Sequence, residues 1–420
     1  LWYTMSITES RPWTQILGYA TSKDGIVWTK PIINKKDKTN IVFHSKISGF
    51  QAAGIFKDPV ARDPQKRYKM LFVACQDGTS KTWSTNAAYS PDGIYWTDEP
   101  TNPIIPFSDN QPSPFWDARL GRYVAYLRYG PPMTRRVTRI ESEDFVHWSP
   151  KVKLFGWTNM DGPYNTQHYG MRAMPYEGLY IGLLTAYYGE TAKPIPKDKE
   201  GWMDKVEAQL TFSRNGRTWL RVGPRGAIPH SDLNKKLNWK KVPKDAAFLP
   251  YGRHKKDWDW GNIYAYQRPL VVRDEIRIYY TGMTGRHWAS YHGDKQSKGV
   301  GLATLRLDGF VSIDAAAAGT MTTKKFVFIG DTLEVNANAK GGSIVVEAFD
   351  ADGKVIEGFS KEDCTPITTD SVRHVLKWKD KNDCHLIQIR PIRLRFHMKK
   401  AKLYSFTPRI RHNHYVQSYD

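Results

Sequence analysis

An aspartate between two tryptophans is the residue of this chain best suited to acid chemistry. It is Asp259, in the run Asp257-Trp-Asp-Trp-Gly261. Two indole rings would exclude water from the carboxyl group, and loss of hydration raises the pKa of a carboxylic acid. A general acid requires such a raised pKa. We therefore expect Asp259 to be a catalytic acid, with Trp258 and Trp260 beside it in the binding site.

Basic side chains are in large excess over acidic ones. Lys and Arg outnumber Asp and Glu by 62 to 42, which gives a net charge of +20 at pH 7. The neighbouring Arg135 and Arg136 could form bidentate contacts with a sulfate or carboxylate group. The chain has no helix-turn-helix, zinc-finger or RNA-binding sheet motif, so we expect no nucleic-acid partner. Two interpretations stay open: the charge attracts an anionic polysaccharide, or it only aids solubility.

The sequence predicts neither a cofactor nor a metal at the site. No Cys/His cluster has zinc spacing, and a structural calcium ion stays undecided. Cys364 and Cys384 could form a disulfide, whereas Cys75 lies in an apolar run. No apolar run approaches the ~18 residues that a membrane span needs. The composition fits a secreted protein, extracellular or periplasmic, although no signal peptide is visible in these residues. The sequence does not predict an oligomeric state.

One short phrase recurs along the chain and indicates a repeated structural unit. Its four copies are Ser22–Trp28, Ser90–Trp96, Ser142–Trp148 and Ser213–Trp219, with a degenerate fifth at Arg306–Phe310. Asp-Gly or Asn-Gly in the phrase favours a tight turn, because both residues tolerate positive φ. The Ser or Asp side chain can cap the turn. The Trp then opens the next strand and packs between sheets.

A β-rich run precedes most copies of the phrase, and a tight turn precedes each run. These runs are Tyr68–Ala74, Tyr123–Arg128, Leu179–Leu184 and Ile276–Tyr280. Each unit therefore predicts four antiparallel strands, and radial repetition of such units is a β-propeller. We expect five blades over residues 1–312, and a β-sandwich with recurrent hairpins is the alternative. The first blade lacks its innermost strand, which either precedes Leu1 or comes from elsewhere in the chain.

A change of composition marks a second domain after Asp314. The small residues Ala315–Gly319 read as a linker, and residues 320–420 follow. Short runs there alternate apolar and polar residues with period two, which is typical of half-buried strands. The predicted fold is therefore all-β: a five-bladed β-propeller followed by a C-terminal β-sandwich of accessory function.

This arrangement of turns and domains resembles the propeller glycoside hydrolases, which include the invertase and fructanase group and the arabinanase and xylosidase group. The chain is most similar to propeller hydrolases of marine polysaccharide-degrading bacteria, including Planctomycetes. The phrases that carry this similarity are Pro175–Leu183, Leu307–Ser312, Gly358–Cys364 and Arg393–Phe396. The resemblance implies an exo-acting glycoside hydrolase that cleaves an anionic, sulfated or uronic, algal or plant polysaccharide. A non-catalytic glycan- or protein-binding propeller and a glycoside phosphorylase are the alternatives.

The resemblance also implies where the catalytic carboxylates lie, because the chemistry needs two of them facing each other. Asp58, in Phe56-Lys-Asp-Pro59, is similar to the Asp of the invertase Arg-Asp-Pro phrase, with Lys57 in place of the Arg. We expect it to open the innermost strand of blade two. Otherwise it only caps a turn before Pro59. Glu207 should begin the third strand of blade four, on the same side as Asp58, or else pair with a cross-strand Lys or Arg.

A further acid would come from the strand missing in blade one. The resemblance places other side chains around the same pit as substrate-binding groups. They are Asp161, Asn165, His168 and Arg172 of blade four, with Arg135, Arg136 and His287 on the rim loops.

Overall fold

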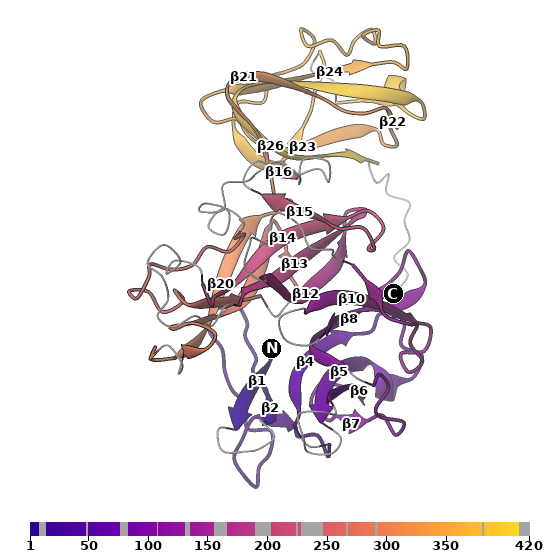
Figure 1. Cartoon of the computed structure of the whole chain (residues 1–420). Coiled ribbons are helices and arrows are strands. Elements are labelled where there is room, and N and C mark those ends of the chain that lie inside the picture. Colours follow the sequence, from indigo (N-terminus) through magenta and orange to yellow (C-terminus); the bar gives the residue numbers. More distant parts are fainter. Residues whose placement is uncertain are drawn as a thin grey trace. The chain divides into compact units, whose positions relative to one another are not determined.

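The computed structural model describes residues 1–7, 14–47, 49–75, 83–106, 108–130, 135–154, 166–189, 203–223, 226–227, 247–265, 268–289, 293–379 and 382–410. Nearly all regular structure in these residues is β-strand (Figure 1), with short 3₁₀ turns at Pro64–Lys66 and His385–Ile387. The predicted all-β class is confirmed. The chain divides into two compact units, one of Leu1–Pro269 with Ile278–Ala303 and one of Leu270–Arg277 with Thr304–Asp420.

In the first unit, successive groups of strands lie around a common centre (Figure 1), as the blades of a propeller do. Blade one holds β1 (Trp2–Ile7), β2 (Thr14–Tyr19) and β3 (Ile41–Phe43). Blade two holds β4 (Gln51–Lys57), β5 (Tyr68–Cys75), β6 (Trp83–Ser90) and β7 (Thr97–Asp98). Blade three holds β8 (Asp109–Asp117), β9 (Arg122–Tyr129), β10 (Arg136–Ser142) and β11 (Val152–Lys153). Neighbouring strands within each blade are antiparallel.

Blades four and five share one sheet. Blade four holds β12 (Thr166–Tyr176), β13 (Leu179–Tyr188), β14 (Val206–Ser213), β15 (Leu220–Gly223) and β16 (Gly226–Ala227). Blade five holds β17 (Asn262–Tyr264), β18 (Leu270–Val272), β19 (Glu275–Met283) and β20 (Lys298–Arg306). Its residues Leu270–Arg277 and 304–306 are counted with the second unit. Val206 of β14 pairs in parallel with Asn262 of β17, which joins the two blades into a 9-stranded sheet. The propeller class is confirmed, whereas the number of blades stays a prediction.

The recurring phrase forms a capped turn between the last two strands of a blade. In Ser213–Trp219, the N–H of Gly216 donates to Ser213 Oγ at 2.9 Å. Asn215 Oδ1 accepts from the N–H groups of Arg217 and Thr218 at 2.9 and 2.8 Å. The indole of Trp219 closes the turn by donating to Gly216 O at 3.0 Å. Short polar side chains thus bind the turn's backbone locally, which is why this phrase specifies the turn.

Contacts between neighbouring blades repeat around the ring. An aromatic side chain of one blade donates a hydrogen bond to the glycine carbonyl in the turn of the next blade. The pairs are Trp2 with Gly93 at 2.7 Å, Tyr126 with Gly216 at 2.9 Å and Tyr279 with Gly25 at 2.7 Å. The last pair joins β19 to the turn that follows β2, so a late strand of this unit lies against its first strands.

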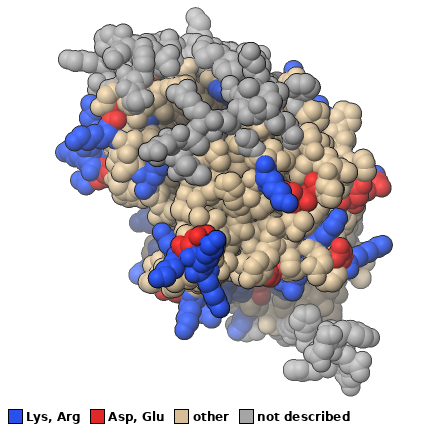
Figure 2. Space-filling model, turned by 90° about the horizontal axis from the view of Figure 1, so that it is seen from below, with Lys and Arg blue, Asp and Glu red and all other residues tan. Residues whose placement is uncertain are grey.

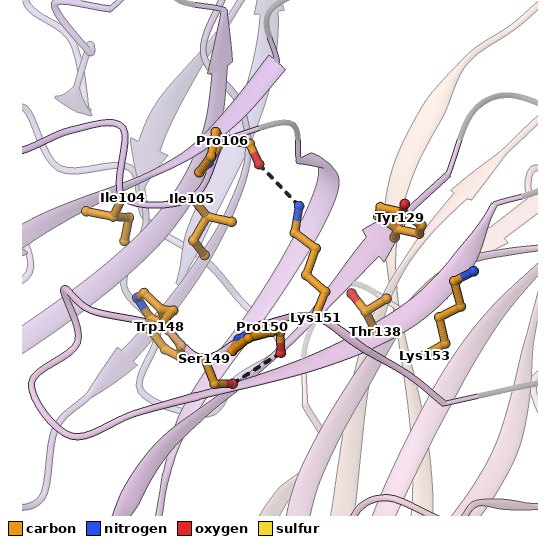
Figure 3. A pocket seen from close by; sticks show the side chains of 10 residues that line it. All are labelled: Ile104, Ile105, Pro106, Tyr129, Thr138, Trp148, Ser149, Pro150, Lys151 and Lys153. Atoms are coloured by element: carbon orange, nitrogen blue, oxygen red, sulfur yellow. Dashed lines mark hydrogen bonds between the residues drawn. The ribbon is translucent and has the colours of Figure 1, made fainter.

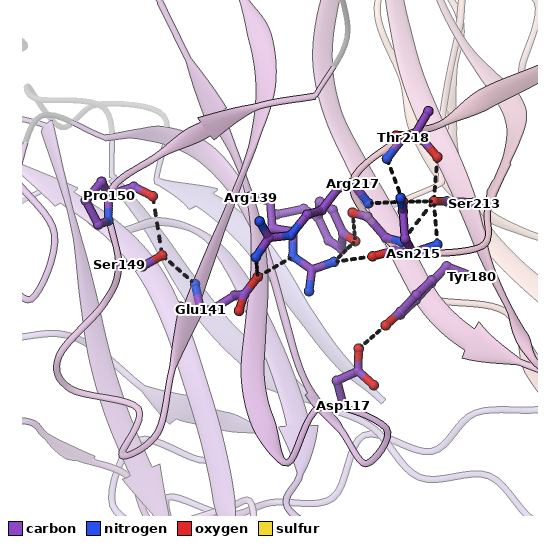
Figure 4. Close-up of polar contacts among 12 residues, drawn as sticks. Asp117, Arg139, Glu141, Ser149, Pro150, Tyr180, Ser213, Asn215, Arg217 and Thr218 are labelled. Atoms are coloured by element: carbon purple, nitrogen blue, oxygen red, sulfur yellow. Dashed lines mark hydrogen bonds and ion pairs between the residues drawn. The ribbon is translucent and has the colours of Figure 1, made fainter.

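Charged side chains add to the junction between blades three and four (Figure 4). Glu141 Oε1 accepts from Arg139 Nε at 3.2 Å in its own strand, and from Arg217 Nη2 at 2.6 Å in the turn of blade four. Tyr180 of β13 donates to the carboxylate of Asp117 at the end of β8. Both contacts cross between blades, so these polar groups position the blades relative to each other.

The innermost strands meet near the centre of the first unit. The guanidinium carbon of Arg268, which follows β17, lies 6.0 Å from the ring centre of Phe56 in β4 and 5.8 Å from that of Phe115 in β8. The backbones of β4 and β8 also come very close. A Cβ atom at Gly54 would lie only 2.2 Å from the carbonyl oxygen of Pro112.

We expect Gly54→Ala to lower the free energy of unfolding by about 2–3 kcal/mol, because the added methyl group must push two inner strands apart. Urea unfolding followed by tryptophan fluorescence measures this loss. Gly121→Ala is the control, since its Cβ would meet nothing within 4 Å. Its positive φ of 61° should cost about 1 kcal/mol. Equal losses in the two variants would show that the inner strands are not tightly packed.

The first blade follows the predicted order. β1 leads into β2, and the phrase Ser22–Trp28 comes after β2, so β1 corresponds to the second strand of the other blades. Where its innermost strand comes from stays a prediction.

The prediction that Ala315–Gly319 is a linker is wrong. These residues lie in β21 (Ile313–Thr322), where Ala315 pairs with Ala401 and Gly319 with Met398.

The second unit contains a 6-stranded sheet around an apolar core that includes Leu333, Val346 and Phe396. Its remaining strands are β22 (Phe326–Val327), β23 (Thr332–Asn338), β24 (Ser343–Phe349), β25 (Asp370–Val375) and β26 (Pro391–Arg409). The long β26 pairs with β21, β22, β23 and β24. A separate sandwich stays a prediction. Cys364 and Cys384, for which the sequence left a disulfide open, are both buried in this core and form no disulfide.

Candidate functional site

Asp58 lies at the opposite end of its strand from the predicted position. The innermost strand β4 begins at Gln51 and ends at Lys57, so Asp58 follows the strand and does not open it. Its buried carboxylate accepts from Lys69 Nζ at 2.8 Å and from the Tyr123 hydroxyl at 2.7 Å. Tyr123 belongs to blade three, so these contacts join two blades. A catalytic role for Asp58 stays a prediction, and its position favours a structural one.

Glu207 begins the third strand of blade four, as predicted, since β14 starts at Val206. Its side chain is fully buried. Oε1 accepts from the Tyr188 hydroxyl at 2.6 Å and from Gln209 Nε2 at 2.7 Å, so neither of these partners is a Lys or Arg. Oε2 has no hydrogen-bond partner among the described residues. Burial raises the pKa of Glu207 to about 7.

Asp259 lies at the same end of the strands as Glu207 and not with Asp58. It precedes β17, which runs parallel to β14 through the Val206–Asn262 pair. Asp259 Oδ2 accepts from the Tyr280 hydroxyl at 2.9 Å, and the residue is 8% exposed. Two of the three predicted catalytic carboxylates therefore share one end of blades four and five, and the third lies at the other end of blade two.

The two tryptophans beside Asp259 have different surroundings. Trp258 is 41% exposed and stacks on Tyr280, with ring centres 5.9 Å apart and an interplanar angle of 18°. Trp260 is buried, and the Lys205 ammonium lies 5.1 Å from its ring centre. Trp258 therefore offers an aromatic face to a ligand, whereas Trp260 helps to fix the strand end on which Lys205 and Glu207 lie.

An aromatic and basic group of side chains lies at this same end, and we call it the Tyr169 cluster. Its members are Tyr169, Tyr187, His287, Arg128 and Arg135. The ring centre of Tyr169 lies 4.7 Å from the ring centre of Tyr187 and 5.3 Å from that of His287. The guanidinium carbons of Arg128 and Arg135 lie 4.6 and 5.0 Å from the Tyr169 ring centre. Two positive charges are therefore held against one ring, which suits an anionic ligand.

The imidazole ring of His287 is neutral at pH 7 in this cluster. Burial, followed by the nearby charges of Arg128 and Arg135, lowers the pKa of His287 to about 4. The chain around His287 is fixed by Asp204, which accepts from the Tyr187 hydroxyl at 2.6 Å and from the backbone N–H of Trp288 at 2.9 Å. The arginines therefore supply the charge of the cluster, and His287 supplies a neutral ring.

The remaining predicted binding residues lie in different surroundings. Arg135 joins the cluster and donates to Gln167 Oε1 at 2.9 Å, whereas Arg136 donates to the carbonyl of Arg135 at 2.8 Å. His168 is buried, with Nε2 at 2.6 Å from Arg221 Nη2. Arg172 is buried against blade three and donates to the carbonyl of Pro112, and its predicted place around the pit stays a prediction. Asp161 and Asn165 lie outside the described residues.

Sequence reasoning missed four contributors to the site: Tyr169, Tyr187, Arg128 and Asp204. The three residues other than Asp204 lie inside apolar strand runs, where such side chains usually belong to the core. Their only sequence signal is position, because each lies within a few residues of a strand end that faces Glu207. Among the described residues, no group of three or more His, Cys, Asp or Glu side chains could hold a metal ion.

No protein-family model matches this chain, and no curated protein matches it in sequence. Solved structures of similar shape include an N-acetylgalactosamine deacetylase from F. plautii in complex with blood group B trisaccharide, at 13% identity and a TM-score of 0.46 over 74% of this chain and 86% of that chain. A family 43 arabinoxylan arabinofuranohydrolase from Bacillus subtilis, in complex with cellotetraose, has 12% identity and a TM-score of 0.37 over 86% and 80%. A family 32 β-fructofuranosidase from Bombyx mori has 12% identity and a TM-score of 0.39 over 95% and 86%. Likenesses this distant assign no activity.

The surface charge is spread over several places on the face that Figure 2 shows. Lys and Arg side chains alternate there with Asp and Glu around a largely uncharged centre. No helix among the described residues is long and apolar enough to span a membrane.

Proposed function

We propose that this chain is an exo-acting glycoside hydrolase with Glu207 as its general acid. The observation that supports this most directly is the buried carboxyl group of Glu207, whose pKa is raised to about 7. A carboxylic acid that keeps its proton near neutral pH can donate it to the leaving oxygen of a glycosidic bond. Tyr188 and Gln209 both bind Oε1, which fixes the orientation of the group.

Asp259 is the proposed second carboxylate, acting as base or nucleophile. Glycosidic cleavage uses a pair of carboxyl groups, one protonated and one ionised. Glu207 takes the acid role that the sequence suggested for Asp259, because the raised pKa falls on Glu207. Asp259 is 8% exposed, whereas Glu207 is fully buried, and it lies at the same end of the strands. The exposed ring of Trp258 next to it would stack on a sugar.

The Tyr169 cluster is the proposed binding site for a sulfate or carboxylate group of the substrate. Arg128 and Arg135 supply two guanidinium groups within 5.0 Å of one ring centre, and guanidinium groups bind such anions in a bidentate manner. An anionic algal or plant polysaccharide is therefore the proposed substrate class. A secreted protein, extracellular or periplasmic, would meet such a polymer directly.

The test is release of reducing sugar from a panel of polysaccharides: sulfated, uronic and neutral. We expect release from at least one anionic member, and single sugars as early products if the enzyme acts from the chain end. The same panel with added inorganic phosphate separates hydrolysis from phosphorolysis, which would yield a sugar phosphate. Binding without product in every arm would leave glycan binding as the function, which the full burial of Glu207 favours as the second candidate.

Salt should weaken capture of an anionic substrate without slowing the chemical step. The screening length in water falls severalfold between about 0.01 and about 1 M salt, so attraction to Arg128 and Arg135 weakens as salt is added. We expect the apparent KM for a sulfated substrate to rise severalfold while kcat changes little. Steady-state kinetics at several salt concentrations measure both constants. An apparent KM that does not change with salt concentration would contradict the assignment of an anionic substrate.

A further inference from the structure

A cavity lies along the outer strand of blade three (Figure 3). It has a volume of about 490 Å³, which is within the range of small-molecule sites. Its described lining residues include Ile104, Ile105, Tyr129, Trp148, Lys151 and Lys153. Tyr129 follows Arg128 in β9, and successive strand residues project to opposite faces. Arg128 therefore faces the Tyr169 cluster and Tyr129 faces this cavity.

Two lysines give the cavity a positive charge. The ammonium groups of Lys151 and Lys153 each lie 5.6 Å from the ring centre of Tyr129. Lys151 Nζ also donates to the carbonyl oxygen of Pro106 at 3.2 Å, which points the group across the cavity (Figure 3). No carboxylate stands among the described lining residues. An anion bound beside the Tyr129 ring would be attracted by both ammonium groups.

The remaining walls are aromatic and aliphatic. The indole N–H of Trp148 already donates to Phe145 O at 3.1 Å, so its ring offers the cavity an apolar surface. Tyr129 is 41% exposed, and Ile104 and Ile105 complete the apolar wall. Flat apolar faces suit the C–H face of a sugar ring, and ammonium groups beside them suit an acidic substituent on that ring.

We propose that this cavity is an accessory glycan site for a sugar that carries a sulfate ester or a carboxylate. It binds without cleaving, since no carboxylic acid lines it among the described residues. It lies on the opposite face of β9 from the Tyr169 cluster, so it holds a separate stretch of an anionic glycan. This site does not depend on the hydrolase activity, because a protein that cleaves nothing would still bind at it.

The test compares the parent protein with Lys151→Met/Lys153→Met by isothermal titration calorimetry. Three probes are used: a sulfated galactan tetrasaccharide, an oligouronate tetrasaccharide and an uncharged galactan tetrasaccharide. We expect the double variant to bind the better anionic probe about tenfold more weakly or worse, because two charged contacts are lost. The uncharged probe should respond little. Lys35→Met/Lys36→Met, on an exposed loop of blade one, removes the same charge and should bind like the parent.

A second variant separates specific binding from general attraction. Tyr129→Ser keeps both lysines but removes the ring between them, and we expect it to weaken the same probe severalfold. Equal weakening in the Lys35/Lys36 control would overturn the proposal, since it would show only the loss of net charge. Unchanged affinity in both Lys151→Met/Lys153→Met and Tyr129→Ser would also overturn it. The kcat on the best substrate of the panel reports on Glu207 separately and should be unchanged in all these variants.

Discussion

Glu207→Gln is expected to lower the hydrolysis rate by about 10²–10⁴-fold, because the amide cannot donate a proton to the leaving oxygen. Gln has nearly the same size and can still bind the Tyr188 hydroxyl and Gln209, so the site should keep its shape. Initial rates on the best substrate of the panel, together with circular dichroism, measure both properties. In the parent protein, kcat should fall as the pH rises above about 7, where Glu207 loses its proton.

The same substitution should change how stability depends on pH. The pKa of Glu207 is raised from its ordinary 4.5 to about 7 by burial. The folded state therefore holds this proton more tightly than the unfolded chain does. The resulting stability is fully present below pH 4.5 and is lost as the pH rises through about 7. Its size is about 3 kcal/mol. Glu207→Gln should remove this loss, so urea unfolding should show a smaller fall from acid to mildly alkaline pH than in the parent.

Glu177→Gln is the matched control, because it makes the same substitution on an exposed turn of blade four. It should alter neither the rate nor the pH dependence of stability. If Glu207→Gln retained the parent rate, Glu207 would not be the general acid. If it lost activity but left the pH dependence of unfolding unchanged, the carboxyl group would act without a raised pKa.

Asp58→Asn is expected to cost about 3 kcal/mol of unfolding free energy, while activity per folded molecule stays near that of the parent. The carboxylate is buried and bonded to Lys69 Nζ at 2.8 Å, so the amide would leave a buried ammonium group without its counter-charge. Thermal unfolding and kcat on freshly folded protein measure the two effects. Loss of kcat with unchanged stability would instead restore Asp58 to the catalytic set.

A double variant checks the physical reason for that loss. In Asp58→Asn/Lys69→Met both charges are gone, so we expect part of the lost stability to return. If the double variant were as unstable as Asp58→Asn, the loss would come from another contact, such as the hydrogen bond from the Tyr123 hydroxyl at 2.7 Å.

Local turn chemistry could be predicted well from the sequence. Ser213, Asn215 and Gly216 specify their turn through contacts within a few residues, and the position of Glu207 at a strand start followed from counting strands between such turns. Asp58 was misplaced because an Asp-Pro step marks the edge of a strand without saying whether the strand begins or ends there. Ala315–Gly319 read as a linker because Ala has low strand propensity, but pairing with β26 overrides it.

Only Arg135 and His287 of the Tyr169 cluster could be predicted, because its members come from three blades. Tyr169 and Tyr187 look like core residues in their own strands, and only packing between blades brings Arg128 and His287 against them. Such contacts depend on the angle between neighbouring sheets, which no local pattern encodes. The same reason applies to the cavity between Tyr129 and Trp148, whose walls also come from different strands.

The parallel pairing of Val206 with Asn262 also has a consequence for motion. Asn262 Oδ1 accepts from the Val206 N–H at 2.9 Å, and its Nδ2 donates to Gly285 O at 2.9 Å, so one amide ties three segments together. Blades four and five should therefore open as one cooperative unit, with matching amide hydrogen-exchange rates in β14 and β17. Glu207, Asp259 and His287 all lie within a few residues of the segments that these hydrogen bonds join. Their relative positions are then set before a ligand arrives, so binding would require little rearrangement of the protein.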